Sequence, residues 1–382
     1  MAKRIVFLYG DTGGGHRSTA QAVEQALELS RPNCYQMALV NGTLWLPFPF
    51  NQSEKSYPVV VNRARFLHAL VFHGLNRRLM VHLMRTWLIS LGWRKAIDMV
   101  QRYPADVYVS CHPLFSQLLP PLMRRLKSPA KVVHIVTDLA SGPAAHFAAD
   151  LDACLVPTPQ AHRQALHYGV PADRIALTGQ PVWPNSRHRM AKGIAVRAAL
   201  GLRLDQPVAL LIGGADGMGT LSPTARAIVH SDLPVQLIVV CGRNEKLRSE
   251  LEAWRANTPS RADGLRTQGF VDNIPELMGA SDILISKAGT LTLCEGLLAG
   301  LPILIYDAIP GQEDGNVEYV TQGGAGVFCP SPRAVVDQLC AWLAEPAELE
   351  RRREAALRLA QPDAALKAAQ VIARLAEGEA ID

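Results

Sequence analysis

Short apolar runs recur along the chain, and stretches with helical periodicity separate them. The first run predicts a strand over residues 3–9, followed by a glycine-rich turn over 10–15 and a helix over about 18–30. Later runs in the first half predict buried strands at 107–110, 132–136 and 153–156. Strands that alternate with helices in this way indicate a parallel sheet.

The same cycle starts again after a proline-containing segment at residues 179–184. Four further runs predict strands at 208–212, 235–240, 283–285 and 302–306. A chain of 382 residues also exceeds the length at which one core usually keeps growing, so two domains are expected. We therefore predict an α/β protein with domains over residues 1–183 and 184–357.

The end of the chain predicts a separate helical element. A basic helix is expected from Glu348 to Leu375, and at about 1.5 Å per residue it is long enough to pack back across both domains. We assign residues 358–382 to this C-terminal segment.

The composition is typical of a globular protein, with 48% hydrophobic and 19% charged residues. No uncharged apolar run reaches the length of a transmembrane helix, and the first four residues lead directly into a strand without room for a signal peptide. The cysteines are scattered singly and are expected to be reduced, without zinc or disulfide pairing. A cytoplasmic location is predicted.

Positive charge is concentrated in the first half. Residues 1–185 contain 19 Lys and Arg against 10 Asp and Glu, whereas residues 186–382 contain 20 against 24. The segment 55–97 holds eight basic residues, no acid and many large apolar side chains at helical spacing. This combination is typical of a helix on an anionic membrane surface, here the inner face of the cell membrane, with candidate acceptor or membrane contacts at Arg77, Arg78 and Trp87.

Two other interpretations of the basic segment remain open. A core-facing helix with a solvated basic face would have the same periodicity. Nucleic acid binding is less favoured, because no recognised binding motif accompanies the charge.

A glycine-rich loop between the first strand and helix includes Gly14, Gly15 and His16. Glycines allow close approach of the backbone to a ligand, and the amino end of a helix favours negative charge. The pattern is neither GxGxxG nor a P-loop, so it does not indicate a dinucleotide or ATP. His16 lies where open α/β sheets bind ligands and is a candidate general base; a helix-capping histidine is the alternative.

Two more loops with similar chemistry occur in the second half. Gly214 lies in a glycine-rich turn after the strand at 208–212 and could present amide donors to a diphosphate. The residues from Ala288 through Gly289, Thr290 and Leu291 to Thr292 form a loop that enters a helix, where amides and hydroxyls can hold phosphate oxygens. Glu295 follows one turn later and can accept both hydroxyls of a ribose. Gln312, Glu313 and Asn316 form a polar cluster suited to sugar hydroxyls.

Four motifs carry a resemblance to a known family: DTGGGHRSTA at 11–20, VTDL at 136–139, GFVDNIPELMGASDILISKAG at 269–289 and PGQEDGN at 310–316. The chain resembles the monogalactosyldiacylglycerol synthases and bacterial diacylglycerol glucosyltransferases, relatives of the peptidoglycan enzyme MurG. The resemblance implies a GT-B fold, in which two Rossmann-like domains face each other across a cleft and the C-terminal helix crosses back to the first domain. It also implies an inverting transfer of a hexose from a UDP-sugar to diacylglycerol, without a metal or a separate cofactor.

The resemblance also implies roles for individual residues. The backbone at Phe270 and Val271 would contact the uracil, Glu295 would hold the ribose, and Arg243 would help to stabilise the departing UDP. His16 would take the proton from the acceptor hydroxyl, with Asp138 or His112 assisting it. The remaining donor-binding positions are those of the glycine-rich loops and the polar cluster, namely Gly14, Gly15, Gly214, Ala288, Gly289, Thr290, Leu291, Thr292, Gln312, Glu313 and Asn316.

The acceptor side departs from the family. A tryptophan usually follows the VTDL motif, and its nearest equivalent here is Phe147. Residues 40–100 also match only loosely. Galactose is the favoured sugar and glucose the alternative. A MurG-like transferase for a polyprenyl-linked acceptor, a UDP-sugar 2-epimerase and a non-catalytic UDP-sugar-binding protein are the other hypotheses.

Overall fold

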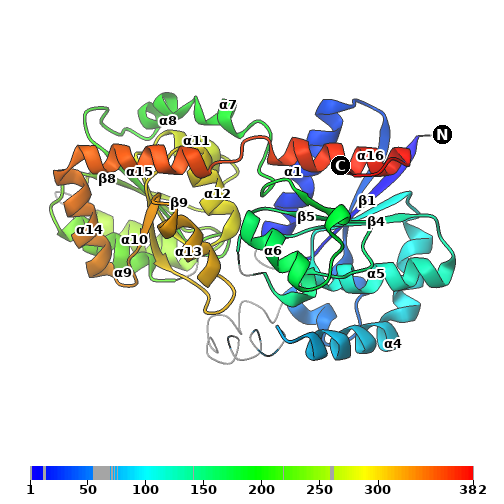
Figure 1. The fold of residues 1–382 in the computed structure, drawn as a ribbon. Helices are drawn as coiled ribbons and strands as arrows, with labels where there is room; N and C mark the ends of the chain where they lie inside the picture. The colour runs from blue at the N-terminus through cyan, green and yellow to red at the C-terminus, as the bar shows by residue number, and fades with distance from the viewer. Residues whose placement is uncertain are drawn as a thin grey trace. The chain divides into compact units, whose positions relative to one another are not determined.

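The structure of the protein, a computed structural model, describes residues 2–11, 14–54, 69, 72, 74, 76–140, 142–217, 219–258 and 262–381. The chain divides into two compact units, each built on its own parallel sheet (Figure 1). Unit 1 comprises residues 1–184, 309–315 and 362–382, and unit 2 comprises residues 185–308 and 316–361.

Unit 1 contains a six-stranded parallel sheet with the order β2-β1-β3-β4-β5-β6. The strands are β1 (Lys3–Tyr9), β2 (Tyr35–Asn41), β3 (Val107–Ser110), β4 (Lys131–Ile135), β5 (Ala153–Val156) and β6 (Ile175–Leu177). The inner strands β3 and β5 are buried along their whole length, as expected for a parallel sheet with helices on both faces.

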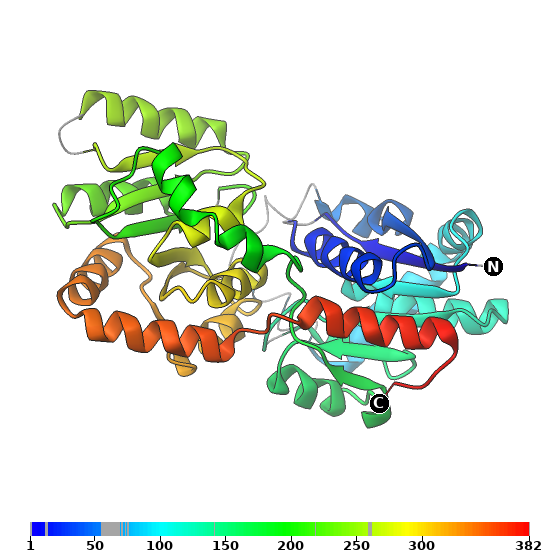
Figure 2. The same ribbon diagram turned by 90° about the horizontal axis from the view of Figure 1, so that it is seen from above.

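Helices cover both faces of this sheet. On one face, α1 (Gly15–Ser30) and α16 (Ala364–Glu377) pack against each other, α1 over β1 and β2 and α16 over β3 and β4 (Figure 2). On the other face lie α4 (Arg78–Arg102), α5 (Pro113–Leu126) and α6 (Pro159–His167). Small residues such as Ala22, Ala26, Ala368 and Ala369 allow α1 and α16 to pack closely.

Unit 2 repeats the plan with the strand order β12-β11-β10-β7-β8-β9. Its strands are β7 (Val208–Ile212), β8 (Gln236–Val240), β9 (Leu265–Gln268), β10 (Ile283–Lys287), β11 (Ile303–Asp307) and β12 (Gly326–Phe328). One face is covered by α9 (Leu221–His230), α10 (Glu245–Asn257) and α14 (Pro332–Ala344). The other carries α11 (Ile274–Gly279), α12 (Thr290–Leu298) and α15 (Pro346–Leu359). Two further helices of unit 2 are α7 (Ser186–Met190) and α8 (Gly193–Ala199), and α13 (Asp314–Gln322) follows the segment 309–315 of unit 1.

The predicted α/β class and the parallel sheets are confirmed, and every predicted strand is present with ends shifted by two residues at most. The four strands that were not predicted, β2, β6, β9 and β12, are the edge strands of the two sheets. Edge strands are covered less completely, so they do not need a continuous apolar run. In β9, for example, only Leu265 is fully buried.

The prediction of one continuous helix from Glu348 to Leu375 was wrong. The segment forms two helices, because α15 ends at Leu359 and α16 starts at Ala364, with Pro362 between them. A proline at this place lacks the amide hydrogen and disfavours helical backbone in the residue before it. The return of the C-terminal helix to the first unit is confirmed, because α16 belongs to unit 1 and the Tyr35 hydroxyl donates to the Glu377 carboxylate at 2.9 Å.

Candidate functional site

The loop between β1 and α1 is held by a carboxylate that the sequence did not indicate. One oxygen of Glu54 accepts hydrogen bonds from the Asp11 amide at 2.9 Å, the Asn41 side chain at 2.8 Å and the Thr43 hydroxyl at 2.6 Å. Desolvation alone would raise the pKa of Glu54, but these hydrogen bonds keep it below its ordinary value. Glu54 thus fixes the start of the loop.

The start of helix α1 requires glycine. Gly14 is the N-cap and has φ 81°, a left-handed conformation that side chains with a β-carbon rarely adopt. Gly15 opens the helix itself, and His16 follows it in the first turn. Both glycines therefore lie directly before the candidate base.

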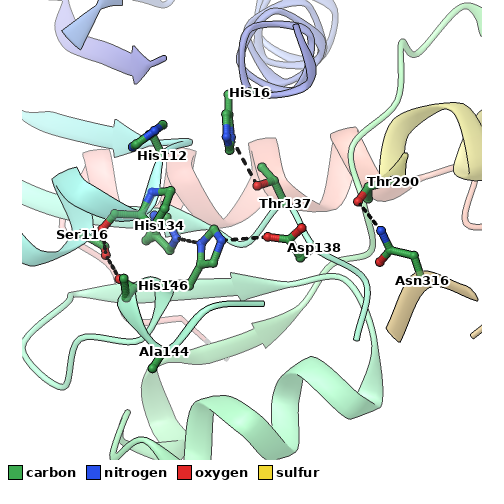
Figure 3. A network of polar contacts seen from close by, with 12 residues as sticks. His16, His112, Ser116, His134, Thr137, Asp138, Ala144, His146, Thr290 and Asn316 are labelled. Carbon is green, nitrogen blue, oxygen red and sulfur yellow. Dashed lines mark hydrogen bonds and ion pairs between the residues drawn. The ribbon is translucent and has the colours of Figure 1, made fainter. Parts of the chain in front are cut away.

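His16 is partly buried at the amino end of α1, and its Nδ1 lies 3.3 Å from the Thr137 hydroxyl (Figure 3). Burial lowers the pKa of His16 to about 4, although the Asp138 carboxylate acts in the opposite direction. The imidazole is therefore neutral near pH 7, the form that can accept a proton.

His112 lies beside His16, with the two ring centroids 5.0 Å apart. It caps α5, because its Nδ1 accepts the Leu114 amide at 3.3 Å, and burial lowers its pKa well below the ordinary value. Gly10 makes room for this ring, since a β-carbon there would lie 2.8 Å from the His112 Cδ2 atom.

Asp138 is buried and hydrogen-bonded to His146, a histidine that no sequence motif marks. Its Oδ2 lies 3.0 Å from His146 Nε2, whose ring in turn reaches His134 (Figure 3). The sequence pattern points only to Phe147 in this segment and does not mark His146. Phe147 itself is 4% exposed and stacks on Tyr168 in the core of unit 1, with ring centroids 5.5 Å apart.

Helix α4 carries the described part of the basic segment; residues 55–68, 70, 71, 73 and 75 lie outside the described residues. Arg77 precedes the helix and Arg78 begins it, where its guanidinium donates to the His167 carbonyl. Trp87 is 37% exposed and lies 5.1 Å from the Phe50 ring.

An outward row of apolar side chains runs along α4. Every fourth residue is a large exposed hydrophobe, at Leu79, Leu83, Trp87 and Leu91. A separate row, including Met84, Leu88 and Met99, faces the core. Helix α4 therefore has two apolar rows, and the core of unit 1 covers only one of them. Within the described residues, no helix is long and apolar enough to cross a membrane.

In unit 2, the glycine-rich turn after β7 lies against two predicted donor-binding residues. Gly214 has φ 73°, and the backbone amide of Arg243 donates to Ala215 at 2.8 Å. The Arg243 guanidinium pairs with Asp216 at 3.2 Å and lies 4.9 Å from the centroid of the exposed Phe270 ring. Arg243 and Phe270 thus form a cation–π pair next to the turn. Val271 packs with the core on the α12 side.

The start of α12 is held by a buried amide. Gly289 is the N-cap, and the helix begins at Thr290 and includes Leu291 and Thr292. Asn316, which is fully buried, donates its side-chain amide to the Ala288 carbonyl at 2.9 Å and to the Thr290 hydroxyl at 3.1 Å (Figure 3). Asn316 therefore shapes the loop that precedes the helix.

Glu295 projects from α12 with 6% of its surface exposed. Burial raises its pKa to about 7, while the charge of Arg189 lowers it. A ligand that donates hydrogen bonds to this buried carboxyl group would stabilise its ionised form.

The polar loop before α13 belongs to unit 1. Gln312 lies in it, and the Oε2 atom of Glu313 accepts the Ile309 amide at 2.8 Å. Gly311 has φ 82°, and its amide donates to Asp314 at 2.9 Å. The backbone of this loop is thus fixed by its own side chains. Across the described ranges, no group of three or more His, Cys, Asp or Glu side chains is arranged to hold a metal ion.

Solved structures with the same architecture define the fold class. MurG from Acinetobacter baumannii has a TM-score of 0.59 at 18% identity, covering 97% of this chain and 99% of MurG. A UDP-GlcNAc 2-epimerase from Neisseria meningitidis, solved with UDP-GlcNAc bound, has a TM-score of 0.63 at 11% identity, covering 97% of this chain and 100% of that one. The two Rossmann-like units and these structural neighbours place the protein in the GT-B fold class.

Sequence comparison then identifies the family. Residues 16–182 match the family described as monogalactosyldiacylglycerol (MGDG) synthase, and residues 208–372 match the glycosyltransferase family 28 C-terminal domain. A probable monogalactosyldiacylglycerol synthase 2, chloroplastic, of Oryza sativa subsp. japonica is 36% identical over 379 residues, which cover 95% of this chain and 78% of that relative. Monogalactosyldiacylglycerol synthase 1, chloroplastic, of Arabidopsis thaliana is 31% identical over 378 residues, 96% of this chain and 69% of that one. The chain belongs to the monogalactosyldiacylglycerol synthase family, which confirms the resemblance seen in the sequence.

Proposed function

We propose that the protein transfers a hexose, with galactose favoured over glucose, from a UDP-sugar to the hydroxyl of diacylglycerol with inversion at the anomeric carbon. The names of its relatives in rice and Arabidopsis, monogalactosyldiacylglycerol synthases, support the lipid acceptor and the galactosyl group. The observation that carries the proposal is a neutral, partly buried His16 beside Thr137 and Asp138 in a unit that matches the same family.

In the proposed reaction, His16 removes the proton from the acceptor hydroxyl as that oxygen forms its bond to the anomeric carbon. The bond between this carbon and the diphosphate oxygen breaks at the same time, and UDP leaves with the electron pair. Thr137 orients the imidazole through its hydroxyl, and the low pKa keeps the base unprotonated at neutral pH.

On the donor side, we assign the diphosphate to the turn at Gly214 and to the amides that begin α12. Aligned amides at a helix amino terminus stabilise the negative charge that develops on the departing UDP. Glu295 accepts the ribose hydroxyls, and the Arg243–Phe270 pair borders the nucleotide. Gln312 and Glu313 are assigned to the sugar.

The acceptor is embedded in a bilayer, so the protein must reach a membrane surface. We assign this contact to the outward apolar row of α4 together with the basic residues Arg77 and Arg78. The proposed location is peripheral, on the inner face of the cell membrane.

Release of UDP measured with UDP-galactose and UDP-glucose, in liposomes with and without diacylglycerol, tests the proposal. We expect release that depends on diacylglycerol, a glycolipid product by thin-layer analysis, and a faster reaction with UDP-galactose. If UDP is released from neither UDP-galactose nor UDP-glucose, the assignment is overturned. Turnover of UDP-GlcNAc with a polyprenyl acceptor, or sugar conversion without lipid, would instead favour a MurG-like or an epimerase-like activity.

A further inference from the structure

The His112 ring is held in place by its surroundings. Its Nδ1 atom accepts the Leu114 amide at 3.3 Å, its ring centroid lies 6.0 Å from that of the Phe115 ring, and Gly10 lies against its Cδ2 edge. Only 8% of the residue is exposed. The fold therefore sets the orientation of this imidazole before any substrate binds.

The hydrogen bond at the start of α5 also determines which nitrogen of His112 carries a hydrogen. A backbone amide can only donate, so Nδ1 of His112 must be the bare, accepting nitrogen. An imidazole with a bare Nδ1 is neutral and has its single hydrogen on Nε2. Burial agrees with this form, because it lowers the pKa of His112 well below the ordinary value.

No group in the described part of the protein accepts the Nε2 hydrogen of His112. Nε2 is also not one of the fully enclosed polar atoms without a partner, so the accessible part of the residue includes it. The His16 ring lies beside the His112 ring, with the centroids 5.0 Å apart and the planes tilted by 58° (Figure 3). An unused hydrogen-bond donor thus lies on the residue next to the proposed base.

The two imidazoles have opposite hydrogen-bonding roles. In the proposed reaction His16 accepts the proton of the acceptor hydroxyl, whereas Nε2 of His112 can only donate. Diacylglycerol presents the matching groups on neighbouring carbons, because the carbon next to the one that bears the hydroxyl carries an ester. The carbonyl oxygen of this ester can only accept a hydrogen bond. The neighbouring pair of base and donor therefore matches the neighbouring pair of hydroxyl and ester.

We propose that His112 is a specificity-determining residue, whose Nε2 hydrogen binds the ester carbonyl next to the reacting hydroxyl of the acceptor. The inference rests on the proposed function, because it takes His16 as the base and diacylglycerol as the acceptor. The hydrogen bond directs the hydroxyl toward His16 and selects lipids with an ester at this position. A lipid with an ether there leaves the donor of His112 without a partner, and a polar group left unpaired in a site gives strong discrimination.

Hexose transfer to three matched acceptors tests the inference with the full-length protein. The acceptors are dioctanoylglycerol, its analogue with an ether in place of the ester next to the hydroxyl, and its analogue with an ether in place of the distant ester. We expect the analogue with the distant ether to react as the diester does, and the analogue with the near ether to have a kcat/KM lower by about tenfold or more. In His112→Ser, the hydroxyl can still cap α5 but the imidazole donor is gone, so the two ether analogues should react at similar rates.

Two controls separate this role from a structural one. Ser331→Ala removes the N-cap of α14 in unit 2 and should leave the preference among the acceptors unchanged. Nitrogen-15 spectra of the histidines in the unmodified protein should show the His112 hydrogen on Nε2.

Three results would overturn the inference: equal rates of the two ether analogues in the unmodified protein, a preference that persists in His112→Ser, or a His112 hydrogen on Nδ1. The first and third are measured without any variant, so they decide the question even if His112→Ser does not fold. If none of the three acceptors receives a hexose, the proposed function itself fails and the inference fails with it.

Discussion

The Asn316 side chain ties the beginning of α13 to the beginning of α12 by donating to the Thr290 hydroxyl at 3.1 Å, in addition to its bond with the Ala288 carbonyl. The amide is fully buried, so both bonds form away from water. The loop proposed to hold the diphosphate is therefore set by a residue 26 positions away in the sequence.

Asn316→Ala should weaken UDP binding by about tenfold, because the loop before α12 loses both hydrogen bonds and its amides are no longer held in place. Titration calorimetry with UDP measures this directly. Glu318→Ala removes an exposed side chain from the same helix and should bind UDP as the unmodified protein does. Equal affinity in both variants would contradict a role for Asn316 in shaping the loop.

His16→Ala should lower kcat by roughly 10²–10⁴-fold, the usual contribution of a positioned general base, while UDP binding is retained. With a pKa of about 4, the base is available from pH 5 upward, and protonation should lower kcat/KM only as the pH falls through about 4. A pH profile of the initial rate checks this. A limb near the ordinary histidine pKa of about 6.5 would mean that another group limits the reaction.

Lowered histidine pKa values also predict a loss of stability in acid. The folded protein holds His16 neutral, whereas the unfolded chain takes up a proton below its ordinary pKa of about 6.5. The contribution of neutral His16 to the free energy of unfolding is complete above about pH 6.5 and is lost as the pH falls from there to about 4. In His16→Gln, the midpoint of denaturant unfolding should therefore fall less steeply between pH 6.5 and 4, and an identical slope would contradict the assignment.

The raised pKa of Glu295 predicts that UDP binds more tightly as the pH rises through about 7. Ribose hydroxyls donate hydrogen bonds, so they favour the ionised carboxylate and lower its pKa on binding. Calorimetry in two buffers of different ionisation enthalpy should detect release of a proton near pH 7. Glu295→Gln serves as the control, because titration of the UDP phosphate is common to both proteins; the release due to Glu295 should be missing there.

Leu83→Glu/Leu91→Glu should reduce binding to anionic liposomes by at least tenfold, because it places two charges on the outward apolar row of α4. Co-sedimentation with phosphatidylglycerol vesicles measures the effect. Ile194→Glu, at a position in unit 2 that is 74% exposed, makes the same kind of change elsewhere and should bind normally. If both variants bind equally well, another surface contacts the membrane.

The sequence predicted the inner strands and the glycine-rich loops because their residues are constrained locally. An inner strand must be apolar on both faces, and Gly14 and Gly214 lie in left-handed backbone that favours glycine. By contrast, His146, Glu54 and Asn316 make their contacts with residues that lie 8 to 43 positions away in the sequence. No local pattern marks His146 or Glu54, and although the sequence does indicate Asn316, its contacts with Ala288 and Thr290 appear only in the fold.

The packing of α16 against α1 has a consequence for synthesis of the protein. Alanine and leucine side chains of α16 complete one of the two cores of unit 1, which also contains side chains of β1, synthesised about 360 residues earlier. The first unit therefore cannot reach its native packing while the second is being translated. The apolar side chains of α1 and β1 that α16 covers therefore stay exposed in the nascent chain until α16 itself has been synthesised.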